Sequence, residues 1–191
     1  MSAPDSILAQ AKAVLDYLEA VTPSDAPRPG HFVIEDPPIS VTCFATMFGL
    51  NWDGSIDTQD NGQGFFGYDT RDKGLYGCSL PREVMLSTFG ISDDWRSSPI
   101  GSVWAQHAGE VRSWVFEHKP LLTVDCLGHT LQNAPLVDAG PAAGTSNGMD
   151  LTYAAAHLLD TQGRALVTYK ITINGTATSI KGWNFSTRRV G

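Results

Sequence analysis

The sequence predicts a mainly β fold, a small barrel with short helices, preceded by an N-terminal α-helix. Three observations support this class. The 191 residues include 19 glycines and 11 prolines, a turn-rich composition that favours strands over a helical bundle. Hydrophobic residues make up 42% of the chain, which is enough to build a full core. Strand and helix signals do not alternate regularly, which argues against a parallel sheet covered by helices.

The N-terminal part of the chain predicts a helix followed by a linker. Residues 5–21 carry apolar side chains at helical spacing, which is typical of an amphipathic helix. Residues 22–38 contain five of the eleven prolines and therefore predict extended chain. The resulting division is an N-terminal helix at 1–22, a proline-rich linker at 23–38 and a barrel domain at 39–191.

In the first half of the barrel domain, the sequence pattern predicts few regular elements. Residues 39–48 are rich in β-branched and aromatic side chains, which is typical of a strand. A polar, glycine-rich loop follows, and residues 73–90 predict a strand or turn and then a short helix. Residues 90–118 have no clean period and are predicted to be an insertion, in which the composition of 111–118 suggests a strand.

The second half of the domain predicts strands around one helix. Residues 120–140 predict two strands around the turn Leu127–His129. The alanine-rich segment 151–160 predicts a short helix, because alanine is the best helix former. Residues 164–173 alternate as a half-buried strand does, and Asn174–Gly175 predicts a hairpin to a last strand at 177–185.

Charge and hydropathy exclude several classes of function. The net charge of −7 and a pI near 5.0 argue against a nucleic-acid partner. No run approaches the roughly 20 apolar residues of a membrane span. The N-terminus has no secretory pattern, so we expect either a cytosolic start, a signal already removed, or export by a specialised secretion system or a phage.

Two aspartates flank a loop rich in glycine, proline and serine, in the segment "DAGPAAGTSNGMDLTYAAAHLL". Taken singly, Asp138 is a turn residue that bonds its own backbone, and Asp150 is the N-cap of the helix at 151–160. The alternative is that Asp138 and Asp150 form a pair of working carboxylates.

The loop at 49–67 offers a second set of candidates. Its acidic residues are either solvated or calcium-like, but the loop lacks the alternation and closing glutamate of an EF-hand. Asp60 is a third, weaker catalytic candidate, and no metal or cofactor is expected. Aromatic side chains in or near this loop and at the start of the 151–160 helix suit stacking on a ligand, although some of them must belong to the core. The aromatic residues are Trp52, Phe66, Tyr68 and Tyr153.

The three cysteines suggest a weaker, thiol-based alternative. Cys43, Cys78 and Cys126 form either one disulfide and one thiol or three free thiols, and their spacing matches no zinc site. A thiol nucleophile would need His107 or His129 beside it. Cys43 lies in an apolar strand and is better explained as a small buried hydrophobic residue.

The segment around the two aspartates resembles the second half of a double-psi β-barrel of the rare lipoprotein A and expansin type. An Asp-x-Gly-Pro turn, Asp138–Pro141, precedes a Met149–Thr152 segment of the hydrophobic-Asp-Leu-Thr form, which leads into an alanine-rich helix. Upstream, "NGQGFFGYDTRDKGLYGCSLP" is similar to the glycine-rich loop of expansins. The resemblance covers about residues 40–185 and implies a six-stranded double-psi β-barrel interrupted by the insertion around 90–118.

The superfamily contains lytic transglycosylases, family 45 endoglucanases, non-hydrolytic expansins and a few protease inhibitors. The resemblance aligns Asp150 with the general acid of the endoglucanases and Asp138 with an aspartate implicated in the transglycosylases. The first strand, "TCFATMF", has no carboxylate where the endoglucanases carry their base. A lytic transglycosylase avoids that need, because the sugar's own hydroxyl attacks.

The sequence therefore predicts a glycan-cleaving enzyme that acts on a cell-wall polysaccharide, with peptidoglycan as the first choice and another β-1,4-glycan as the second. Two alternatives stay open, a non-catalytic expansin-like polysaccharide-binding protein and a protease-inhibitor-like barrel. The N-terminal helix would contact a delivery or inhibitor partner.

Overall fold

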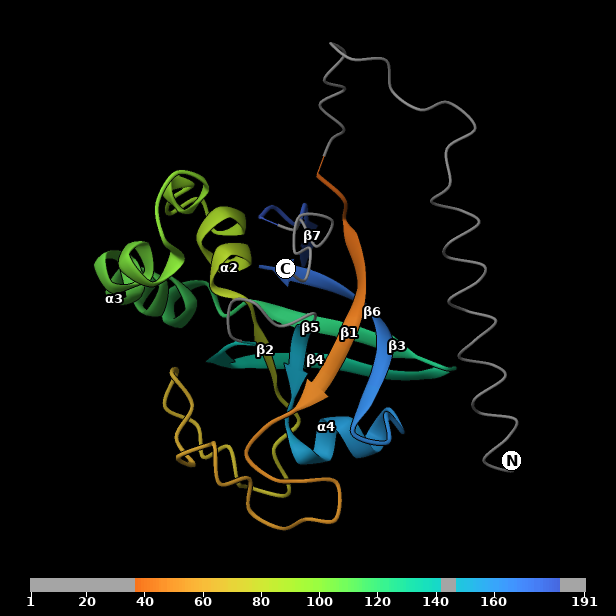
Figure 1. Ribbon diagram of the computed structural model, residues 1–191. Coiled ribbons are helices and arrows are strands. Elements are labelled where there is room, and N and C mark those ends of the chain that lie inside the picture. Colours follow the sequence, from red (N-terminus) through yellow and green to blue (C-terminus); the bar gives the residue numbers. More distant parts are fainter. Residues whose placement is uncertain (1–36, 142–146, 183–191) are drawn as a thin grey trace, which may run out of the picture. The chain divides into compact units, whose positions relative to one another are not determined.

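The computed structural model describes residues 37–141 and 147–182 (Figure 1). The predicted N-terminal helix and most of the predicted linker lie outside these residues. The strands of the described part are β1 Ser40–Met47, β2 Cys78–Leu80, β3 Leu121–Cys126, β4 His129–Ala139, β5 Asn147–Leu151, β6 Arg164–Ile173 and β7 Thr176–Thr178. The helices are α2 Arg82–Thr88, the 3₁₀ helix η1 Asp94–Arg96, α3 Ile100–His118 and α4 Tyr153–Leu158.

Six strands close into a barrel, which confirms the predicted mainly β class. Their order is β1-β5-β2-β4-β3-β6, and β6 pairs back onto β1. The pairs β1–β5 and β2–β4 are parallel, and the other four pairs of the barrel are antiparallel. The short strand β7 extends from β6 outside the closed ring.

Alternating side chains fill the barrel, as the sequence pattern predicts. On β1 the buried positions are Val41, Cys43 and Ala45, and on β6 they include Val167 and Tyr169. Both predicted hairpins are present, although β7 ends at Thr178 and is shorter than the strand predicted at 177–185. The central residues of the β6–β7 turn, Asn174 and Gly175, both have positive φ, as the favoured two-residue hairpin turn requires.

Most of the segment predicted to be an insertion is helical, so the strand suggested for 111–118 is wrong. Residues 100–118 form α3, whose buried side chains Val103, Trp104, Val111 and Val115 lie along one side of the helix. Phe116, in contrast, is 51% exposed. This exposed aromatic side chain, together with the β-branched valines, gives the segment the composition of a strand, although its burial repeats at helical spacing.

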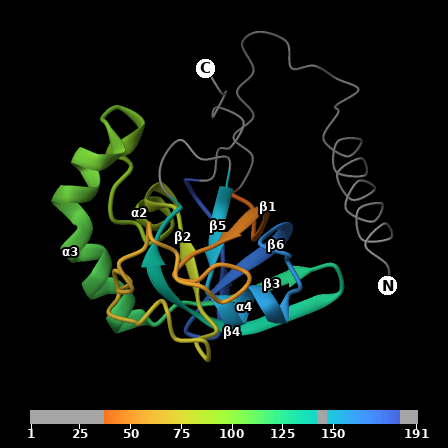
Figure 2. The ribbon, with the colours of Figure 1, turned by 60° about the horizontal axis from the view of Figure 1, so that its bottom comes forward.

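The helices and the long loop cover different parts of the barrel. In Figure 1, α2 and α3 lie together at one side, and α4 lies with the loop of residues 48–77 at the end reached by β1 and β5. Figure 2 turns this loop and α4 to the front of the barrel. None of the helices described by the structure is long and apolar enough to cross a membrane.

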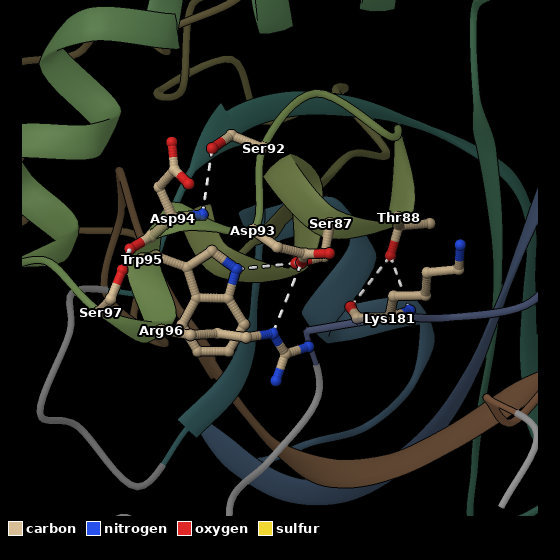
Figure 3. Close-up of polar contacts among 9 residues, drawn as sticks. All are labelled: Ser87, Thr88, Ser92, Asp93, Asp94, Trp95, Arg96, Ser97 and Lys181. Carbon is tan, nitrogen blue, oxygen red and sulfur yellow. Dashed lines mark hydrogen bonds and ion pairs between the residues drawn. The ribbon is translucent and has the colours of Figure 1, made fainter. Parts of the chain in front are cut away.

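A polar network joins α2 to η1 and to the C-terminal segment (Figure 3). The hydroxyl of Ser87, a buried residue, donates to Asp93 Oδ1 and accepts the indole N–H of Trp95 at 2.7 Å. One residue later, the Thr88 hydroxyl accepts the backbone N–H of Lys181 at 3.0 Å. We call these contacts the Ser87 network. They attach both flanking segments to one short helix.

Candidate functional site

Strand register brings Asp138 and Asp150 into one row on the barrel wall. Ser79 of β2 pairs with Asp138 of β4 on one side and with Asp150 of β5 on the other. Asp150 in turn pairs with Thr46 of β1. The two aspartates are therefore separated by a single strand, which puts their Cα atoms two inter-strand spacings apart, roughly 9–10 Å.

The surroundings of Asp150 favour its protonated form. The side chain is half-buried, and its Oδ1 accepts a hydrogen bond from the Thr46 hydroxyl. Burial raises the pKa of Asp150 from 3.8 to about 6. The Thr46 bond lowers this pKa and the charge of Asp138 raises it, both by less than burial does. A carboxyl with such a pKa can both donate and accept a proton near neutral pH.

The interpretation of Asp150 as a helix cap is wrong. Strand β5 runs through Asp150 to Leu151, and the N-cap position of α4 is taken by Thr152. The Thr152 hydroxyl makes no cap bond and instead accepts the backbone N–H of Gly77 at 3.0 Å. Asp150 is thus free of a capping role and lies on a strand beside its neighbours in the row.

Asp138 is held by the glycine-rich loop. Its Oδ1 accepts the backbone N–H of Phe65 at 2.7 Å, so this carboxylate oxygen bonds a segment 73 residues away in the sequence. The loop lies close to β4 at this point, because the backbone N–H of Phe66 reaches the Val137 carbonyl at 3.3 Å. A Cβ on Gly64 would lie 2.2 Å from the same carbonyl, which explains the glycine.

The turn after β4 approaches Asp150. Gly140 accepts a hydrogen bond from the Ser79 hydroxyl at 3.0 Å. A Cβ at position 140 would lie 3.1 Å from Asp150 Oδ2 and 3.2 Å from Ser79 Oγ. The glycine of the Asp-x-Gly-Pro turn therefore leaves room at the carboxyl oxygen that Thr46 does not bond.

Asp60, the third predicted carboxylate, bonds within its own loop. Its Oδ1 accepts the backbone N–H of Gly62 at 2.6 Å and the Thr70 hydroxyl at 2.7 Å. Its carbonyl oxygen accepts a bond from the Arg71 guanidinium. These bonds give Asp60 a loop-stabilising role, and they do not join it to the Asp138–Asp150 row.

Two of the predicted stacking residues are brought together, but protein groups already contact their rings. The Trp52 ring is stacked on His157 with centroids 3.8 Å apart, and it packs against the core. Tyr153 lies beside the same imidazole at 4.2 Å and under the Lys73 ammonium at 5.5 Å. Trp52 and Tyr153 thus help to fix the 49–57 segment on α4.

The other two predicted stacking residues have different surroundings. Phe66 is only 2% exposed and is part of the hydrophobic core, so it offers no ring face to a ligand. Tyr68 is 38% exposed, and its carbonyl accepts the backbone N–H of Gly64. Of the four predicted aromatic residues, Tyr68 is therefore the one that is most available to a ligand.

The cysteines do not form a thiol site. All three are free and buried. Burial raises the pKa values of Cys43 and Cys78 well above their usual range and raises that of Cys126 to about 11. A thiolate is therefore disfavoured at each position. Among the residues that the structure describes, no cluster of three or more His, Cys, Asp or Glu side chains could hold a metal ion.

Sequence reasoning missed three residues of the site, namely Thr46, Ser79 and Phe65. Thr46 alternates with the buried positions of β1, which marks it as facing away from the barrel interior, but no local signal assigns it to Asp150. Ser79 joins the two aspartates only through strand register. Phe65 contributes through its backbone N–H, which no side-chain pattern reveals.

Comparison with known proteins finds a distant structural likeness. The chain matches neither a protein-family model nor a curated protein. Among solved structures it is similar to a Streptomyces papain inhibitor, with 20% sequence identity and a TM-score of 0.38. The match covers 72% of this chain and 99% of the inhibitor. A likeness at this level assigns no function to the chain.

Proposed function

We propose that the protein cleaves a cell-wall glycan by acid–base catalysis at Asp150 and Asp138, on a barrel of the double-psi type. The observation that carries the proposal is the pairing of these carboxyls across Ser79. One of the two has its pKa raised to about 6, and the other is held by a backbone N–H. The two parallel strand pairs support the double-psi assignment.

Asp150 is the general acid in this proposal. Its proton passes to the glycosidic oxygen as the bond between that oxygen and the anomeric carbon breaks. Asp138, held in place by the Phe65 N–H, stabilises the positive charge that develops on the sugar ring. The attacking group is either water or a hydroxyl of the same sugar, and its proton returns to a carboxylate.

The products distinguish the two modes of attack. Attack by the sugar's own hydroxyl, which is the lytic transglycosylase reaction, leaves anhydro ends on peptidoglycan fragments. Attack by water leaves reducing ends, and it needs two carboxyls about 6.5–9.5 Å apart. Mass spectrometry of muropeptides and cello-oligosaccharides incubated with the protein identifies both the glycan and the mode of attack.

The first prediction concerns the general acid. We expect Asp150→Asn to lower the rate of glycan cleavage by about 10²-fold or more, because the amide cannot donate a proton to the leaving oxygen. In the wild-type protein the rate should fall as pH rises above about 6, where Asp150 loses its proton. The rate is measured from the fragments seen by mass spectrometry.

A matched control is Asp125→Asn. Asp125 is also a strand aspartate that accepts a threonine hydroxyl bond, from Thr130 at 2.6 Å, but it is exposed on β3. This variant should keep wild-type activity. Full activity of Asp150→Asn, with the fold intact, would rule out the proposed acid.

One observation favours a second candidate, a binding protein that holds glycan without cutting it. The β1 residue paired with Asp150 is Thr46, a hydroxyl where a hydrolase would place a base. Such a protein would sediment with insoluble polysaccharide and release no product. A stable complex with a cysteine protease, without affinity for sugar, would instead point to the inhibitor alternative.

A further inference from the structure

The α3 insertion contacts the loop that holds Asp138. Trp104 of α3 is buried, at 7% exposed, and its ring meets Phe65 with centroids 5.2 Å apart and planes tilted by 57°. The Arg82 guanidinium of α2 lies over the same indole at 5.3 Å. Further along α3, Arg112 Nη2 lies 3.9 Å from the place that a Cβ on Gly67 would occupy. The helix therefore flanks the loop at two points.

Phe65 links this packing to the carboxylate. Its ring contacts Trp104, and its backbone N–H donates to Asp138 at 2.7 Å. The segment around Phe65 is not part of a helix or strand, so no ladder of backbone hydrogen bonds fixes its N–H in place. Hydrogen bonds within the loop, such as that from Gly64 N–H to the Tyr68 carbonyl, supply part of the order. Contacts from outside the loop add to it, and each residue held in one conformation costs about 1–2 kcal/mol of entropy.

We propose that Trp104 is a positioning residue, which holds the Phe65 N–H on Asp138 and so sets the geometry of the carboxylate pair. This inference rests on the proposed function of Asp138 and Asp150. It gives the α3 insertion a role in the site, although α3 supplies no group to the row of aspartates. The ring that Trp104 contacts and the N–H that Asp138 accepts both belong to Phe65. A change at Trp104 that displaces the Phe65 ring therefore also moves the Phe65 N–H.

The second prediction tests this link without any catalytic assay. We expect Trp104→Ala to speed hydrogen exchange of the Phe65 amide by about tenfold. A tenfold change corresponds to roughly 1.4 kcal/mol, which is the size expected for the loss of one hydrogen bond. The pKa of Asp150, measured by carboxyl ¹³C NMR, should shift in the same direction as in Asp138→Asn. We expect Asp138→Asn to lower the pKa of Asp150, because the charge of Asp138 raises it. Trp104→Phe, which keeps an aromatic ring, should restore most of both values.

Trp114→Ala is the matched control. It removes an indole from the same helix, but this ring stacks on Phe89 at 4.1 Å and on His118 at 4.3 Å, away from Phe65. The control should lose stability without changing Phe65 exchange or the Asp150 pKa. Equal effects of Trp104→Ala and Trp114→Ala on both readouts would overturn the proposal.

A second variant covers the case in which Trp104→Ala does not fold. Phe65→Leu keeps the backbone N–H and removes the ring that Trp104 contacts, so it should give the same two changes. Unchanged exchange at residue 65 would contradict the link. Both readouts are structural, so a wild-type protein that cleaves no glycan would defeat the proposed function and leave this result standing.

Discussion

At the scale of single residues, the fold brings the pKa of the Asp150 carboxyl close to neutral pH. In an unfolded chain it would titrate near 3.8, and in the barrel wall its pKa is about 6, mainly because it is half-buried. The folded protein therefore holds this proton more tightly than the unfolded chain does. Between pH 3.8 and about 6, a rise in pH therefore lowers the contribution of Asp150 to the free energy of unfolding.

The third prediction follows from that sign. The contribution of Asp150 to stability should be most favourable below pH 4 and should fall by at most about 3 kcal/mol as pH rises through 6. Asp150→Asn removes this loss, so we expect the variant to be more stable than wild type at pH 7.5. The comparison is made by urea unfolding at pH 4 and pH 7.5.

Asp125→Asn again serves as the control, because Asp125 is exposed and its charge needs no burial. The prediction is contradicted if the free energies of unfolding of wild type and Asp150→Asn differ by the same amount at pH 4 and pH 7.5. Replacing a buried carboxyl often stabilises a protein when that carboxyl belongs to a functional site. There the folded state keeps a group that lowers stability because the group is needed for the chemistry.

Sequence reasoning located both aspartates but misread the local structure of one. Asp150 precedes an alanine-rich helix, and an aspartate in that position usually caps. The strand β5 overrides this preference, because Met149 and Leu151 on either side of Asp150 are fully buried in the core. Two apolar neighbours that alternate with a polar residue are a strand pattern, and this signal was available in the sequence.

At the scale of elements, side-chain hydrogen bonds connect α2 to η1 and to the segment around Lys181. Neither α2 nor η1 has a side-chain bond at its N-cap. The Ser87 network instead joins α2 to η1, and Thr88 joins α2 to the segment before Gly182. The chain passes close to α2 there, since a Cβ on Gly182 would lie 2.3 Å from the Glu83 carbonyl.

The fourth prediction concerns this network. Ser87→Ala should lower the free energy of unfolding by about 1–3 kcal/mol, because the buried hydroxyl both accepts the Trp95 N–H and donates to Asp93. Trp95 fluorescence should report the altered surroundings of the indole. Ser97→Ala removes an exposed hydroxyl that donates to the Asp94 carbonyl in the same region, and it should cost little. Similar losses in the two variants would show that the network adds no stability.

The α3 helix shows why elements are harder to predict than residues. Its segment contains Val111, Trp114, Val115 and Phe116, side chains with high strand propensity, and its propensity alone suggested a strand. Packing decides otherwise, since Val103, Trp104, Val111 and Val115 face the core at helical spacing. Tertiary contacts with α2 and the glycine-rich loop, which no local pattern contains, hold the helix in place.

At the scale of the whole molecule, the barrel class could be predicted because turns and alternation are repeated along the chain. The register that creates the site could not. Thr46, Asp150, Ser79 and Asp138 come from four strands, and a shift of one residue in any pair would send one of these side chains to the other face. Register depends on the closure of the ring, which is a property of all six strands together.

The fifth prediction belongs to this closure. Strand β6 pairs with β1 over residues 164–170 and with β3 over residues 168–172, so the amides of 168–170, where both pairings overlap, should exchange with solvent only when the whole barrel unfolds. Amides of β7, which pairs with β6 alone, should exchange faster. Native-state hydrogen exchange in low urea measures both. Equal protection of the two strands would contradict this view of the barrel as the cooperative unit.

A closed ring also limits how molecules of this protein can associate with one another. Exposed strand edges are templates for pairing with other chains, and a barrel leaves none within its ring. In the part of the chain that the structure describes, β7 is the strand that ends the sheet, and it is three residues long with the polar sequence Thr-Ala-Thr. Such a short, polar edge offers little for a second chain to extend. The described barrel should therefore resist edge-to-edge aggregation even at high concentration.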